Sequence, residues 1–262
     1  MRNSGIFWGG LLIVVGVAFL LNTLGVLPGI PWRVIWPVAL ILLGLVFLIN
    51  AAGRRGEETA EALALQLKGF ESAAVDLRYG AGRLTLDAGA APDELLNGLF
   101  AGGVTHRLSD DGGVARVTLS SPADAVWDWG GRRTRDWAIH LNGDVPLELT
   151  MDTGAAEVRA DLSATQTRRL FLRTGASSTE ITLPAAAGHS LARVEGGAGS
   201  VRLVVPPGVA ARIEGGAAVG RFDVDGDRFP RAGSVWQSPD YETAANRAEI
   251  AVTFGAGEVQ VR

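Results

Sequence analysis

Two apolar runs near the amino terminus constrain this chain more than any other feature. The runs at residues 5–27 and 34–50 contain no charged side chain. The first 52 residues hold only two charges, Arg2 before the first run and Arg33 between the two runs. The shorter run would form about 26 Å of helix at 1.5 Å per residue, close to the ~30 Å hydrocarbon thickness of a bilayer. We therefore expect residues 1–52 to form a two-helix transmembrane hairpin.

The charges that flank these runs predict which side of the membrane the rest of the chain occupies. A hairpin of two spans leaves both of its ends on one side. Arg2, Arg54 and Arg55 flank those ends, whereas the loop between the spans offers Arg33 alone. Because cytoplasmic flanks carry the excess of Lys and Arg, we expect a multi-pass protein of the cell membrane whose remaining domain is cytoplasmic.

Composition excludes several classes of function. The whole chain has a formal net charge of −4, and the first 52 residues hold two arginines and no acid, so residues 53–262 carry −6. An acidic domain is a poor match for nucleic acid, whose phosphates require a basic surface. Cysteine is absent, which excludes disulfides, thiolate catalysis and cysteine-ligated metal.

One glycine-centred unit recurs six times after residue 70. Apolar residues lie three and five positions before the central glycine and at even offsets after it, which is the period of strands with one buried face. The parity changes across the glycine, and this indicates a bend, where glycine accepts positive φ without steric cost. The central glycines are Gly80, Gly154, Gly175, Gly197, Gly216 and Gly255.

The spacing of these units predicts the fold class. Four of them follow one another at intervals of 21, 22 and 19 residues. A regular spacing near ~20 residues favours an all-β solenoid, with a β-sandwich as the alternative because two strands per unit also fit one. We expect a linker at 53–69 and a β-solenoid domain at 70–262, with interrupting loops or caps at 91–107, 120–142 and 226–247.

The most unusual local cluster reads WDWGGRRTRDW at residues 127–137. Its tryptophans and arginines could bind an anionic lipid headgroup or a partner protein. Alternatively, alternate tryptophans fill the interior while Arg and Asp face water. The candidate binding residues are Trp127, Trp129, Arg132, Arg133, Arg135 and Trp137.

Motifs for catalysis, metals and cofactors are not recognisable. The three histidines are far apart and none has metal-ligand spacing. Residues 223–227 (DVDGD) differ from a calcium loop because glycine stands at position four rather than six and Ser234 occupies position twelve; we expect a polar turn there. Nucleophile elbows and HExxH pairs do not occur either. The sequence therefore predicts no enzyme site, metal or cofactor.

Several longer sequence segments of the chain resemble the LiaF-type cell-wall-active antibiotics response family, whose members carry a toastrack domain. The phrases GGLLIVVGVAFLLNTLGVLP and WPVALILLGLVFLI resemble its membrane module, and APDELLNGLFAGG, GASSTEITLP and GAGSVRLVVP are similar to its toastrack region. The resemblance implies a bacterial, non-enzymatic membrane protein with a toastrack-like β domain. It also implies regulation of a membrane sensor kinase during envelope stress.

Three hypotheses of function result. The first is a membrane-anchored, non-enzymatic interaction protein that senses or relays cell-envelope stress, with lipid and a sensor histidine kinase or other membrane protein as partners. The second is a self-assembling, membrane-bound solenoid scaffold, a homo-oligomer that an open terminal strand at 249–262 would favour. The third is an extracytoplasmic glycan- or lipid-binding protein. None of them involves nucleic acid.

Overall fold

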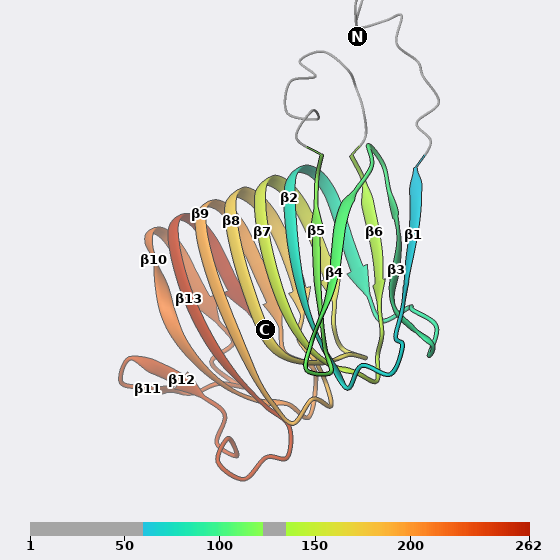
Figure 1. Cartoon of the computed structure of the whole chain (residues 1–262). Coiled ribbons are helices and arrows are strands. Elements are labelled where there is room, and N and C mark those ends of the chain that lie inside the picture. The colour runs from blue at the N-terminus through green and yellow to red at the C-terminus, as the bar shows by residue number, and fades with distance from the viewer. Residues whose placement is uncertain (1–59, 123–134) are drawn as a thin grey trace, which may run out of the picture. The chain divides into compact units, whose positions relative to one another are not determined.

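Strands account for all the regular secondary structure that is described in this computed structural model, which covers residues 60–122 and 135–262 (Figure 1). They form one hydrogen-bonded sheet of thirteen strands. The strands are β1 (Glu61–Gln66), β2 (Ser72–Asp87), β3 (Glu94–Phe100), β4 (Thr105–Asp111), β5 (Val114–Ser120), β6 (Trp137–Leu141), β7 (Pro146–Asp161), β8 (Gln166–Thr182), β9 (His189–Val204), β10 (Ala210–Val224), β11 (Arg231–Ala232), β12 (Val235–Gln237) and β13 (Arg247–Val261).

The six predicted units are the six long strands of this sheet. They lie side by side in the order β2, β7, β8, β9, β13, β10, and every neighbouring pair is parallel. Their register aligns equivalent residues, so that Val75 lies beside Leu149 and Leu149 beside Leu170. Each strand bends over near its central glycine, and its two halves lie in two facing layers (Figure 1). The parallel, coiled array confirms the predicted solenoid.

The hydrophobic core lies between the two layers. As the sequence pattern predicts, positions three and five before the central glycine and four and six after it are buried in five of the six units. In β10 the first half is buried, but Gly220 and Phe222 are not, because that half-strand is the last of its layer. Burying one large apolar side chain contributes about 1.5–3 kcal/mol. The buried members are Val75, Leu77, Leu84, Leu86, Leu149, Met151, Val158, Ala160, Leu170, Leu172, Thr179, Ile181, Ala192, Val194, Val201, Leu203, Ala211, Ile213, Ile250, Val252, Val259 and Val261.

The bend in β13 requires glycine. Gly257 has φ 138°, in the region that side chains avoid. A Cβ at this position would lie 1.9 Å from the carbonyl oxygen of Gly199 on β9. The adjacent strands approach each other so closely at the bend that even a methyl group does not fit.

The amino-terminal end of the array is closed by five further strands. β3 and β6 extend one layer beyond β2, and β5 and β4 extend the other. The expected interruptions at 91–107 and 120–142 thus include strands that cover the end of the stack. The sheet also begins before residue 70, within the expected linker, because β1 pairs with β3 and buries Leu65.

The carboxy-terminal end corrects the expectation of an open terminal strand at 249–262. β13 lies inside the array, between β9 and β10, and pairs with both over nearly its whole length. The expectation was wrong because chain order does not fix strand order: the 22 residues between β10 and β13 are long enough to return the chain to an inner position. The terminal long strand is β10.

Within residues 60–122 and 135–262, no helix is long and apolar enough to cross a membrane. The expected hairpin at 1–52 and residues 53–59 of the expected linker lie outside the described residues.

Candidate functional site

Three separate parts of the chain meet at the turn between β3 and β4. This turn contains Gly102 and Gly103, both with positive φ. The Glu61 carboxylate at the start of β1 accepts a hydrogen bond from the Val104 N–H at 3.1 Å. A Cβ on Gly103 would lie 3.6 Å from the Pro122 side chain, and one on Gly102 would lie 3.9 Å from the Arg135 side chain. We call this place the Glu61 corner. 

Pro122 and Arg135, which flank segment 123–134, therefore both lie beside the Glu61 corner. Trp127, Trp129, Arg132 and Arg133, four of the six predicted binding residues, belong to this segment and lie outside the described residues. The other two, Arg135 and Trp137, are described and have different environments. 

Trp137 is a core residue. Its side chain is 2% exposed, and its ring lies 5.0 Å from the Phe100 ring in an edge-to-face arrangement and 5.1 Å from the Tyr79 ring. Such aromatic pairs add about 0.5–1.5 kcal/mol beyond their buried area. Here the alternative interpretation of the tryptophan cluster holds, since this indole fills the interior and is not available at the surface.

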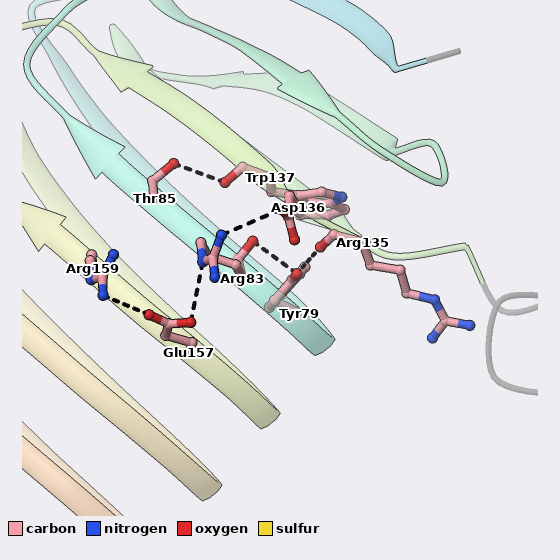
Figure 2. A network of polar contacts seen from close by, with 8 residues as sticks. All are labelled: Tyr79, Arg83, Thr85, Arg135, Asp136, Trp137, Glu157 and Arg159. Atoms are coloured by element: carbon pink, nitrogen blue, oxygen red, sulfur yellow. Dashed lines mark hydrogen bonds and ion pairs between the residues drawn. The ribbon is translucent and has the colours of Figure 1, made fainter. Parts of the chain in front are cut away.

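Arg135 is partly exposed and its backbone is fixed. The Tyr79 hydroxyl donates to the carbonyl oxygen of Arg135, and the carbonyl oxygen of Arg83 lies 3.0 Å from the same hydroxyl (Figure 2). Burial, and secondarily the nearby Asp136 carboxylate, raise the pKa of Tyr79, although Arg135 opposes the shift. The phenol therefore remains a donor through the physiological pH range, and it fastens the backbone of Arg135 to the bend of β2.

Ion pairs continue from this point across the outer face of the sheet. Arg83 lies 3.8 Å from Asp136 and 3.2 Å from Glu157, and Arg159 lies 2.8 Å from Glu157 (Figure 2). These side chains are about one-third to two-thirds exposed, so each pair contributes roughly 0–1 kcal/mol to stability. The Arg135 guanidinium extends away from these pairs (Figure 2), so this part of the surface has three guanidinium groups and two carboxylates. The surface beside the corner is polar and slightly basic.

The other chemical candidates are structural. His106 is exposed on β4, whereas His140 lies 2.5 Å from Asp87 and His189 lies 3.9 Å from Glu249. The described residues contain no group of three metal-ligand side chains. 

Residues 223–227 form the expected polar turn. The Asp225 carboxylate accepts hydrogen bonds from the backbone N–H groups of Asp227 at 3.1 Å and Arg228 at 3.4 Å. Asp223 forms an ion pair with Arg262. Two of the three carboxylates of this motif, those of Asp225 and Asp223, thus hold the turn and Arg262.

Sequence reasoning did not find the Glu61 corner. The adjacent glycines at the end of the segment APDELLNGLFAGG could have indicated it. Paired glycines often adopt positive φ and form a tight turn that other parts of the backbone approach closely. The hydrogen bond between the Glu61 carboxylate and that turn leaves no recognisable pattern in the sequence.

Two family models match the chain. The N-terminal domain of toast_rack, DUF2154, matches residues 53–204, and the LiaI-LiaF-like transmembrane region matches residues 6–48. No curated relative matches.

Among solved structures, the chain is similar to a protein of Clostridium sporogenes ATCC 15579 that is described as a candidate cell adhesion protein. The TM-score is 0.67 at 19% identity, and the match covers 78% of this chain and 99% of the other. A candidate adhesin of Bacteroides fragilis NCTC 9343 covers 79% and 98%, at 9% identity and a TM-score of 0.26, which is too low to indicate a common fold. The first likeness supports the β architecture alone.

Proposed function

Since this chain belongs to the toast_rack family and carries a LiaI-LiaF-like transmembrane region, we propose that it is a membrane-anchored regulatory protein that relays cell-envelope stress by contacts of its β domain. The proposed mode of action is non-enzymatic modulation of a sensor kinase or another membrane protein. Residues 1–52 would form the two-helix anchor, and the β domain would lie on the cytoplasmic side.

The Glu61 corner is the observation that carries this proposal. Glu61 at the start of β1 lies at this corner, and beside it lie Pro122 and Arg135, which flank the segment that contains Trp127, Trp129, Arg132 and Arg133. Indole and guanidinium groups are the side chains most enriched at interaction hot spots. We propose that these four residues, with Arg135 beside them, contact the partner protein or anionic lipid. Trp137 supports them from the core.

Deletion of the gene tests the proposed regulatory role. In its host, deletion of the gene should change the transcriptional response to a cell-wall-active antibiotic, and the wild-type gene should restore it. A response that does not differ between deletion and wild type would contradict the proposal.

The proposed contact is tested in the same strain. Trp127→Ala with Trp129→Ala, and separately Arg132→Ala with Arg133→Ala, should reproduce the deletion at unchanged protein levels in the membrane. Arg202→Ala, an exposed arginine on β9 far along the array, is the matched control and should behave as wild type. Full activity of both double variants would exclude the segment as the contact.

The side of the membrane on which the β domain lies can be tested by thiol labelling, because the chain contains no native cysteine. Ser200→Cys places a thiol at an exposed position of β9. A membrane-impermeant maleimide should label it in inverted vesicles but not in intact cells. Labelling of intact cells would place the domain outside.

A further inference from the structure

The outer backbone edge of β10 is paired with another strand only within its first half, although the Trp236 ring of β12 lies 5.3 Å from the Phe222 ring of the second half. β12 pairs with β10 through Arg212, Ile213 and Glu214 and no further. From Gly216 to Val224, β10 pairs with β13 on one side, and no described strand pairs with its other side. Figure 1 shows β10 at the end of the row, with β11 and β12 beside one part of it. Backbone N–H and C=O groups along the free half can therefore accept another strand.

The free half of β10 has few of the features that usually prevent strand addition, since its charged residues are Arg221 and Asp223 alone. Its nine residues, GAAVGRFDV, contain no Lys and no Pro, and Val219 is 69% exposed. The edge strand β4 differs, since it carries Arg107, Asp110 and Asp111 among seven largely exposed residues. Charged residues of this kind discourage edge-to-edge pairing.

Charge selects the strand that fits this edge. Arg221 and Asp223 lie two residues apart, so both project from the same face. If a second copy pairs antiparallel about a two-fold axis at Phe222, Arg221 of each copy lies opposite Asp223 of the other. A two-fold axis at Arg221 or at Asp223 would instead place identical charges opposite each other.

The two charged residues can both take part in this pairing. Arg221 is exposed and makes no ion pair with any described residue. Asp223 is paired with Arg262, but a carboxylate has acceptor sites for a second guanidinium. Opposite charges directly across two strands contribute about 0.2–1 kcal/mol for each pair, and like charges are unfavourable. The two-fold axis provides this contribution twice.

We propose that two copies of this chain dimerise through residues 216–224 of β10, in the antiparallel register centred on Phe222. The contact is short, and a membrane anchor raises the effective concentration of the two domains. The dimer joins the sheets of both copies and closes this edge. It goes beyond the proposed regulatory function and does not depend on it.

Cysteine crosslinking of the full chain in its membrane tests the register, because no native thiol interferes. One chain carries Arg221→Cys, and a second, with a different tag, carries Asp223→Cys. In the proposed dimer these positions face each other at a Cα separation of about 4.5–5.5 Å, whereas a position and its own copy are offset diagonally by about 7–8 Å. Disulfides need Cα atoms within roughly 4.4–6.8 Å. Oxidation should therefore join the two different chains at least about fivefold more than either chain to itself.

A control and a rescue make the result decisive. Arg202→Cys lies on the same outer face but two strands inward, and it should not crosslink to Asp223→Cys. Among charge variants, Arg221→Asp alone and Asp223→Arg alone should each lower dimer yield, and co-expression of these two should restore it. Protease resistance of the β domain confirms that each variant is folded. Crosslinking that does not prefer the 221–223 combination, or single charge variants that dimerise as wild type does, would overturn the proposal.

Discussion

Replacing Gly257 by alanine tests the bend that gives this domain its two layers. The new Cβ would lie 1.9 Å from the Gly199 carbonyl oxygen and 2.9 Å from its carbon, so backbone atoms of neighbouring strands must separate. Overpacking of this kind costs about 1–3 kcal/mol. The φ of 138° adds about 1–3 kcal/mol for a residue with a side chain. We expect a loss of about 2–6 kcal/mol in the free energy of unfolding.

Gly216→Ala is the matched control. This glycine is the central glycine of β10, it has no positive φ, and a Cβ there would meet no atom within 4 Å. We expect its free energy of unfolding to change by less than about 0.5 kcal/mol, as is usual for exposed substitutions.

Pulse proteolysis of the full chain in detergent, across a urea series, measures both variants against wild type. Because the slope for a small protein is about 1–3 kcal/mol per molar urea, Gly257→Ala should lower the midpoint by about 1 M or more. Equal midpoints for the two variants would refute the reasoning, since the close approach of β9 and β13 at the bend would then not exist.

Three further substitutions test the core, the hydrogen bond to Arg135 and the start of β3. Trp137→Ala should lower the free energy of unfolding by about 3–5 kcal/mol, measured by the same urea series; a loss under about 1 kcal/mol would contradict its burial. The raised pKa of Tyr79 predicts that this phenol's contribution to stability is constant below pH ~10 and declines above it, because the unfolded chain releases this proton first. Tyr79→Phe should reduce that decline in thermal unfolding, and the remainder belongs to Tyr241, whose pKa burial also raises. Asn142→Ala should cost about 1–3 kcal/mol because its amide donates to the Glu94 carbonyl oxygen at 2.7 Å, and hydrogen exchange at β3 should rise; unchanged exchange would contradict this.

The repeat was predictable from sequence because it is local. Period-two burial and the change of parity at glycine identify all six long strands, and the burial of Leu77 and Leu84 on either side of Gly80 agrees with that pattern. The β-rich domain and its solenoid character follow from the same observations. The family resemblance, which rested on whole phrases, is confirmed as well.

The order of the strands was not predictable, because pairing over long distances in sequence leaves no local pattern. β13 has the same alternation as the other units, and nothing in its residues states that it pairs with β9 and β10 rather than at an edge. The candidate site shows the same limit. In β6, Trp137, Ile139 and Leu141 are buried and the residues between them are less so. This alternation identifies Trp137 as a core residue, but only if residues 137–141 are already known to form a strand.

The inner position of β13 has a consequence for the synthesis of the protein. While the ribosome still holds the last residues, β9 and β10 have no strand between them, and both leave backbone groups unsatisfied. A chain that ends between residue 224 and the start of β13 at Arg247 would keep that gap. A chain that ends at residue 246 and so lacks β13 should therefore be degraded by quality-control proteases, although more than nine-tenths of the 262 residues are present.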